Sequence, residues 1–312
     1  MNVKFINLDD NESIFFAREL EFIKARSFDI KFPQLKARMH IPVSFEAGPG
    51  AESITYSQFD SVGIFKVIGA YADDLPRSDV RGKQFTSQVK SLGGSYGYSV
   101  QEIRSAALAN KPLVDRKAMA TRRSYEQKVN RIGWFADGSA IFGGLQGFLF
   151  NPNTTKAAAP TGNWIASATP DQIIDDINNG INKIRDITKG IEEPDTVLLP
   201  VLEFSFIASK PRSATTDTTI LEFVKRNNPG ITTWDWVNEL KDVTPAPSGA
   251  AGPTNIMLTY KKDPGQLSFE IPQDYEQFPP QARNLEFVVP AHGRNGGVII
   301  YYPLSIFITE GI

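Results

Sequence analysis

The stretch VDRKAMATRRSYEQKVNRIGWF, residues 114–135, decides the fold because it predicts a single long helix. Its apolar and small side chains recur every three or four residues, which is the spacing of one helical face that packs on a core. That face comprises Val114, Ala118, Thr121, Tyr125, Val129 and Ile132. The other faces carry Arg116, Lys117, Arg122, Arg123, Lys128 and Arg131 against Asp115 and Glu126. A solvated basic face is the simplest interpretation of these charges.

Upstream of this helix, the sequence predicts a short helix and a long two-stranded ribbon. Ser99-Val100-Gln101-Glu102 has the spacing of a capping box and opens a helix that pauses at Asn110-Lys111-Pro112. Residues 53–71 are rich in β-branched and aromatic side chains, and the partner strand is expected at residues 84–92. The polar linker at 72–82 is too long for a tight turn. Because an isolated ribbon is marginal in water, we expect it to lie against a neighbouring copy.

The first residues combine apolar and basic side chains in a segment too short to fold alone. We predict a helix at about residues 13–24, followed by an extended stretch into Pro33. Such a segment is typical of an arm that docks on another surface. The pattern fits equally well a first helix that packs on its own domain.

Downstream, helices and strands alternate in a mixed α+β pattern. Thr169-Pro170-Asp171-Gln172 combines an N-cap, a proline at the first helical position and a capping glutamine, so a second long helix begins there and ends at Gly190. Its buried face is predicted to be Ile173, Ile177, Ile181 and Ile184. Further predictions are a helix at 217–227 and strands at 196–199, 231–240, 256–261, 267–271, 285–290 and 298–302. Asn295-Gly296 predicts a hairpin between the last two strands.

Composition excludes several classes of protein. The 312 residues are 41% hydrophobic and 22% charged with a net charge of -2, which is an ordinary globular make-up. Cysteine is absent and there are two histidines, so we expect no disulfide, no metal site and no cofactor. No apolar run approaches the roughly 20 residues that span a bilayer, so we expect no membrane segment or secretion signal.

One motif indicates a possible enzyme. Gly93-Gly94-Ser95-Tyr96-Gly97 matches the G-x-S-x-G nucleophile elbow and precedes Asp263, Asp274 and His292, the residue types of a serine hydrolase. However, no βαβ series precedes the motif and no oxyanion segment lies upstream of it. A glycine hinge between the ribbon and the following helix is the simpler interpretation, and we predict a protein without an active site.

Several stretches resemble the major capsid proteins of tailed bacteriophages, and in particular a major capsid family formerly known as a domain of unknown function. They are residues 13–21, SIFFARELE; residues 71–76, YADDLP; residues 95–103, SYGYSVQEI; and residues 285–290, LEFVVP. Residues 144–151, GLQGFLFN, are similar to the segment that follows the long helix in such subunits, although Phe150 departs from the pattern. The resemblance covers nearly the whole chain.

This resemblance implies an α+β fold of the Hong Kong ninety-seven type, which encapsulin shells also use. Its parts would be an N-terminal arm at 1–50, an extended β-ribbon loop at 51–98, a peripheral domain with a long spine helix at 99–165, an axial α/β domain at 166–264, and return strands that complete the peripheral domain at 265–312. It implies a structural, non-enzymatic subunit that self-assembles into an icosahedral head shell around double-stranded DNA. An encapsulin-like compartment is the alternative shell function.

The resemblance also implies which residues meet which partners. Subunit contacts are expected at Ile14, Phe15, Phe22, Phe28 and Phe32 of the arm and at Asp73, Asp74, Arg77, Asp79 and Arg81 of the ribbon tip. The spine is expected to face the interior with Arg116, Arg122, Arg123 and Arg131, which would contact packaged DNA weakly or pair with acidic ribbon-tip residues. The partners would be further copies in hexamers and pentamers, with possible scaffold, portal and decoration proteins. The location would be the virion, after assembly in the host cytoplasm.

Overall fold

The computed structural model describes residues 31–67, 75, 77–108, 113–136, 144–213, 215 and 217–312. The chain divides into two units, Met1–Gln34 and Leu35–Ile312, and every described helix and strand belongs to the second. The predicted arm helix and several expected contact residues lie outside the described residues. These are Ile14, Phe15, Phe22, Phe28, Asp73 and Asp74.

The two helices predicted around residues 99–135 are confirmed. Helix α2 spans Val100–Leu108 and helix α3 spans Leu113–Phe135. The capping box is formed, because the Glu102 amide donates to Ser99 Oγ at 3.1 Å and the Ser99 amide donates to Glu102 Oε2 at 3.0 Å. Val129 and Ile132 of the predicted apolar face are fully buried.

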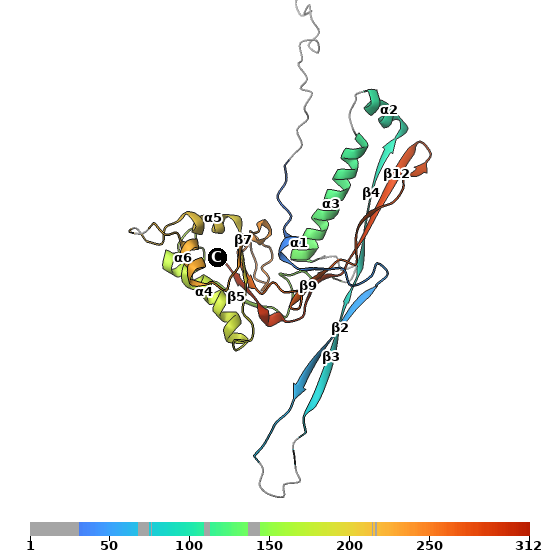
Figure 1. Cartoon of the computed structure of the whole chain (residues 1–312). Helices are drawn as coiled ribbons and strands as arrows, with labels where there is room; N and C mark the ends of the chain where they lie inside the picture. The colour runs from blue at the N-terminus through green and yellow to red at the C-terminus, as the bar shows by residue number, and fades with distance from the viewer. Residues whose placement is uncertain are drawn as a thin grey trace, which may run out of the picture. The chain divides into compact units, whose positions relative to one another are not determined.

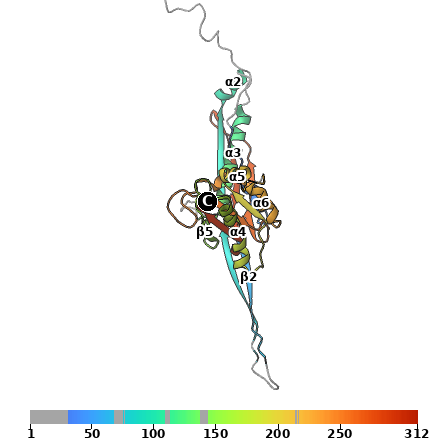
Figure 2. The same ribbon diagram turned by 90° about the vertical axis from the view of Figure 1, so that its left-hand side faces the viewer.

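The ribbon is confirmed, but both of its strands differ from the prediction: the first ends at Val62 rather than at residue 71, and the second begins at Asp79 rather than at residue 84. Strands β2 (Ser53–Val62) and β3 (Asp79–Gln88) pair antiparallel from Ser53 opposite Gln88 to Val62 opposite Asp79, and both views draw them side by side (Figures 1 and 2). The chain then leaves the ribbon at Val89, and β4 (Lys90–Ser99) pairs with β12 (Glu286–Asn295). The predicted strand at 84–92 therefore spans the junction of two sheets.

Strand β12 is the centre of one antiparallel sheet. It pairs with β4 and also with β10 (Gln273–Gln277) and β11 (Gln281–Arg283). A second sheet has the order β1 (Val43–Ser44), β9 (Leu267–Glu270) and β13 (Gly297–Ile300). The hairpin predicted at Asn295-Gly296 is wrong, because β12 and β13 belong to different sheets. The turn marks the crossing, and Gly297 there has a φ of 75°.

A five-stranded sheet and three helices complete the described fold. The strand order is β5 (Thr155–Ala158), β14 (Ile306–Glu310), β8 (Ile256–Tyr260), β6 (Thr196–Leu199) and β7 (Thr233–Trp236). Helices α4 (Pro170–Ile187), α5 (Val201–Ser209) and α6 (Ile220–Asn227) accompany it (Figure 1). The predicted capping box and the buried isoleucine face of α4 are both confirmed. Helix α6 begins at Ile220 rather than 217 because Thr219 caps it.

The buried side chains form two clusters. One surrounds Trp134, Phe148, Tyr260 and Phe269, and the other lies beneath α4. Shorter elements are α1 (Ala37–His40) and the 3-10 turns Asn238–Leu240 and Pro303–Ser305. None of the helices in the described ranges is long and apolar enough to cross a membrane. The α+β class expected from the sequence is confirmed.

Candidate functional site

The glycine-rich motif at 93–97 lies inside a strand. Gly93 to Gly97 fall within β4, which pairs with β12 over its whole length, and Ser95 stands opposite Pro290. A nucleophile elbow requires a sharp turn between a strand and a helix. The predicted hinge is therefore wrong, and the position of Ser95 is also wrong for an elbow.

The other residues of the possible hydrolase do not assemble around Ser95. His292 stands opposite Gly93, and both Ser95 and His292 line one cleft, but no hydrogen bond joins them within the described part of the chain. Asp274 instead accepts two hydrogen bonds from the Arg38 guanidinium, at 2.8 and 3.0 Å. Asp263 accepts one from the Gly265 amide at 2.8 Å. A serine nucleophile needs a hydrogen-bonded base and a carboxylate that orients it, and this geometry supplies neither.

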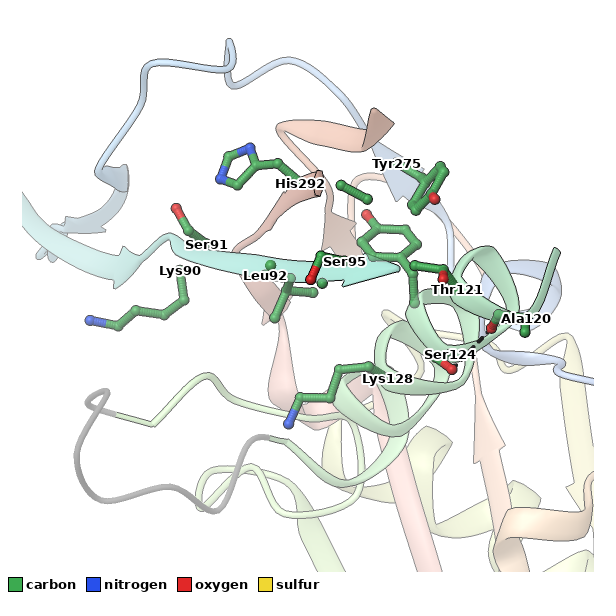
Figure 3. A pocket seen from close by; sticks show the side chains of 14 residues that line it. Lys90, Ser91, Leu92, Ser95, Ala120, Thr121, Ser124, Lys128, Tyr275 and His292 are labelled. Atoms are coloured by element: carbon green, nitrogen blue, oxygen red, sulfur yellow. Dashed lines mark hydrogen bonds between the residues drawn. The ribbon is translucent and has the colours of Figure 1, made fainter. Parts of the chain in front are cut away.

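The cleft itself lies between β4 and α3 and has a volume of about 540 Å³. Its cationic groups are Lys90 and Lys128, which Figure 3 shows extending on the same side. Its hydroxyl groups come from Ser91, Ser95, Thr121, Ser124, Tyr125 and Tyr275. No aspartate or glutamate is among the described residues that line it. The cleft therefore has the chemistry to receive an acidic group.

The ribbon exposes an unusual number of large apolar side chains. They are Phe59, Val62, Ile64, Phe65, Val67, Leu75 and Val80. Phe65 is 97% exposed and Val67 fully so. Monomeric proteins rarely expose a contiguous apolar surface of this kind. Exposed apolar side chains of this kind are typical of a surface that another molecule covers.

The expected ribbon-tip residues that the structure describes lie at one end of β3. Arg77, Asp79 and Arg81 are exposed, and Asp79 Oδ1 accepts a hydrogen bond from the Val80 amide at 2.8 Å. Phe32, the one expected arm contact among the described residues, is 49% exposed. Their role as subunit contacts stays a prediction.

The four arginines expected on the spine all lie on α3. Arg116, Arg122 and Arg131 are exposed and Arg123 is half-buried. Lys117 of the same helix is used internally, since its ammonium donates to the Gly97 carbonyl at 2.9 Å and to Glu102 at 3.0 Å. The backbone hydrogen bond from Ser99, with the Lys117 ammonium beside it, lowers the pKa of Glu102. The interior orientation of the arginines stays a prediction.

A buried ionic cluster at the start of the second unit was not found from the sequence. The Lys36 ammonium lies 2.9 Å from both carboxylate oxygens of Asp235 and donates to the Trp236 carbonyl at 2.6 Å. His40 Nε2 lies 2.9 Å from Asp235 Oδ2. Burial lowers the pKa of His40 despite the carboxylate beside it. The hydrogen bond from Lys36 holds the pKa of Asp235 below its usual value, although burial opposes this.

This cluster fixes α1 between several distant elements. The Ala37 amide donates to Asn130 of α3 at 2.9 Å, and Tyr260 of β8 donates its hydroxyl hydrogen to the His40 carbonyl at 2.7 Å. Arg38 bridges Glu126 of α3 and Asp274 of β10. The basic residues at alternate positions 36, 38 and 40 could have indicated this cluster. Their acidic partners, however, lie about 90 to 240 positions away in the sequence, so no local pattern identifies them. Residues from Leu35 onward therefore belong to the folded unit.

Comparison with known proteins gives one family. Residues 63–312 match the family model described as Major capsid protein. No curated protein matches this sequence.

Several solved structures share the fold. A chain from the capsid of Myoviridae phage XM1 has a TM-score of 0.85 at 20% identity, covering 96% of this chain and 99% of that one. Mycobacterium phage Ogopogo gives 0.62 at 12% identity, covering 96% and 99%, and Gordonia phage Cozz gives 0.62 at 10% identity, covering 99% and 98%. These likenesses confirm the phage capsid fold that the resemblance implied.

Proposed function

The chain belongs to the major capsid protein family, and from this premise we propose how its copies build the shell. It is a structural protein of the phage head and its place is the capsid of the virion. The proposal is that the ribbon β2–β3 and the residues before Leu35 are the segments that hold neighbouring copies together in an icosahedral shell of hexamers and pentamers. An encapsulin-like storage shell has less support, because the family match and the phage structures point to a viral head.

The exposed apolar ribbon is the observation that carries this proposal. Burying a large apolar side chain contributes about 1.5–3 kcal/mol. Phe65 and Val67 contribute none of this in an isolated copy, because both are essentially fully exposed. In a closed shell each copy meets several neighbours at once, so weak contacts add to a very stable assembly.

The remaining roles follow from the proposed shell. The residues before Leu35 would serve as the arm and residues 53–88 as the ribbon, both shorter than the expected parts at 1–50 and 51–98, because Leu35 begins the folded unit and β4 pairs with β12. The parts at 99–165, 166–264 and 265–312 would serve as peripheral domain, axial domain and return strands. Arg116, Arg122, Arg123 and Arg131 would line the interior and touch packaged double-stranded DNA through weak, salt-sensitive contacts. The alternative is that they pair with Asp73, Asp74 or Asp79 of a neighbour's ribbon tip. Replacing Arg122 and Arg123 by glutamine separates these roles, since a lining role affects genome packaging and a pairing role affects shell assembly.

The protein has no enzymatic step in this proposal. Its partners are further copies, with scaffold, portal and decoration proteins as further candidates, and assembly takes place in the host cytoplasm. Ser95 has no hydrogen bond to His292 among the described residues, and Asp274 is bonded to Arg38 instead, which supports a purely structural role for this serine. Replacing Ser95 by alanine should therefore leave assembly unchanged.

The test of the proposal removes the apolar ribbon surface without touching the fold. Phe65→Ser combined with Val67→Ser should give a soluble, folded protein that fails to form particles, because these side chains have no intramolecular packing to lose. Light scattering and negative-stain microscopy measure particles, and urea unfolding measures the fold.

The matched control is Ile191→Ser, which removes an apolar side chain that is 79% exposed but lies outside the ribbon. This variant should assemble normally. Normal particles from the ribbon variant would refute the proposed role of the ribbon. Loss of particles in both variants would show that the effect is general rather than specific to the ribbon.

A further inference from the structure

We propose that the cleft between β4 and α3 binds the acidic segment at residues 5–13 of a second copy. This inference rests on the proposed function, because it requires copies that assemble, and it names a docking site for one segment of the neighbouring chain. It is carried by the chemistry of the cleft, by the open edge of β4 and by the sequence of the segment.

The charge of the cleft suits an acidic segment. Lys90 and Lys128 both line the cleft, and none of the described residues that line it is a carboxylate (Figure 3). The hydroxyls of Ser91 and Ser95 can donate hydrogen bonds to carboxylate oxygens. Those of Thr121 and Ser124 already donate to backbone carbonyls of α3. Complementary charge of this kind selects a partner and suppresses wrong ones.

The backbone of β4 is accessible from the cleft. Six successive residues, Lys90 to Ser95, line the cleft, and two of them are glycines without a side chain. β12 pairs with one edge of β4, and within the described ranges no strand pairs with the other. An open edge presents amide and carbonyl groups that can add an extended segment from another chain. The cleft can therefore bind both the backbone and the acidic side chains of an incoming segment.

The amino-terminal segment has the composition that such a cleft would bind. Residues 5–13 read FINLDDNES and contain Asp9, Asp10 and Glu12 with no basic residue, together with Phe5, Ile6 and Leu8. The ribbon tip at 72–82 is the other acidic candidate, but there Asp73, Asp74 and Asp79 are offset by Arg77 and Arg81. The amino-terminal segment is therefore the better match for a cationic cleft with a largely apolar floor.

The absence of cysteine from the chain makes the contact directly testable. Copies that carry only Asp10→Cys are mixed with copies that carry only Ser124→Cys, assembled, and oxidised. A disulfide between the two then arises only from contact between copies, and it requires the two Cα atoms to come within about 7 Å. We expect a cross-linked dimer on a non-reducing gel. The matched control pairs Asp10→Cys with Met119→Cys, a residue of the same helix that is 69% exposed and does not line the cleft, and should cross-link at least tenfold less.

A charge exchange gives a second, independent readout. Lys90→Glu with Lys128→Glu should lower the Asp10 to Ser124 cross-linking rate roughly tenfold, since facing like charges cost at least the 1.4 kcal/mol that a factor of ten represents. Adding Asp9→Lys and Glu12→Lys to the arm-side copy should restore the rate.

The outcomes separate this inference from the proposed function. Particles in the microscope without a cross-link at Ser124 would overturn the docking site and leave the shell function intact. Cross-linking of Ser124→Cys to Asp74→Cys in place of Asp10→Cys would also overturn it and assign the cleft to the ribbon tip. A cross-linking rate that the charge exchange leaves unchanged would overturn the recognition of the acidic segment by Lys90 and Lys128.

Discussion

Replacing Asp235 by asparagine should destabilise the folded unit strongly, because it removes the charge that neutralises a buried ammonium. The Lys36 side chain is 7% exposed and its ammonium lies 2.9 Å from both Asp235 oxygens. The same carboxylate bonds His40, which is fully buried. The substitution therefore disturbs both residues that fasten α1 to β7.

The magnitude follows from what Lys36 would keep. Removing one partner of a buried ion pair typically costs about 3–5 kcal/mol. Here the ammonium retains the Trp236 carbonyl and lies 3.6 Å from the centre of the Trp236 ring, and the Asp235 side chain is 21% exposed. These compensations lower the expected cost to about 2–3 kcal/mol.

The assay is urea unfolding of the unassembled protein, followed by tryptophan fluorescence. Shells must be avoided because association adds its own concentration-dependent stability. With a slope of about 3 kcal/mol per molar urea, the midpoint should fall by nearly 1 M. Lys36→Met alone and Lys36→Met with Asp235→Asn complete a double-mutant cycle. The double variant should be more stable than Asp235→Asn, because no unpaired buried charge remains. A loss below about 0.5 kcal/mol for Asp235→Asn, or strictly additive losses, would refute this reasoning.

Two further predictions concern the same unit. Gly293→Ala should lower the unfolding free energy by about 1–3 kcal/mol, because its Cβ would lie 2.6 Å from the Tyr125 ring, whereas Gly93→Ala, which meets nothing within 4 Å, should change it little. Burial holds the pKa of His40 below its value in the unfolded chain, so the unfolded chain binds the proton more readily. The free energy of unfolding should therefore fall as the pH drops below about 6.5, by at most about 1.4 kcal/mol per pH unit. Urea midpoints between pH 7.5 and 5.5 measure this slope, which should flatten in His40→Gln and persist in His292→Gln.

Local signals in the sequence predicted the helices well. The capping boxes at Ser99 and Thr169 and the isoleucine face of α4 each involve residues within a few positions of one another, and all of them formed. The helix predicted from Val114 to about Phe135 also formed, at Leu113–Phe135, for the same reason. Short-range geometry and side-chain periodicity are sufficient for such elements.

Signals that depend on distant partners were interpreted incorrectly. The glycines of β4 suggested a hinge, yet they lie in a paired strand, where a Cβ on Gly97 would clash with the Glu286 carboxylate. Asn295-Gly296 suggested a hairpin, yet the Gly296 amide donates to the Glu270 carbonyl in another sheet. Lys36 and Asp235 are 199 positions apart, and no local pattern relates them. Each of these features depends on contacts between residues that are far apart in the sequence, and such contacts cannot be predicted from local patterns in one sequence.

The junction at Val89 connects the two surfaces that we propose for assembly, the ribbon and the cleft. β3 of the ribbon and β4 beside the cleft are separated by this single residue, which is 6% exposed and donates its amide hydrogen to the Glu52 carbonyl at 2.9 Å. Tyr56 of β2 also packs edge-on against Tyr301, with ring centres 4.9 Å apart, so the base of the ribbon is fixed while its far end is exposed. A neighbour that holds the ribbon and a neighbour that occupies the cleft would therefore act on two strands that follow one another directly in the chain. The junction is buried and hydrogen-bonded, so ordering β3 also restricts the motion of β4, and ordering β4 restricts β3. Binding of a neighbour at the ribbon should therefore raise the affinity of the cleft for its own neighbour.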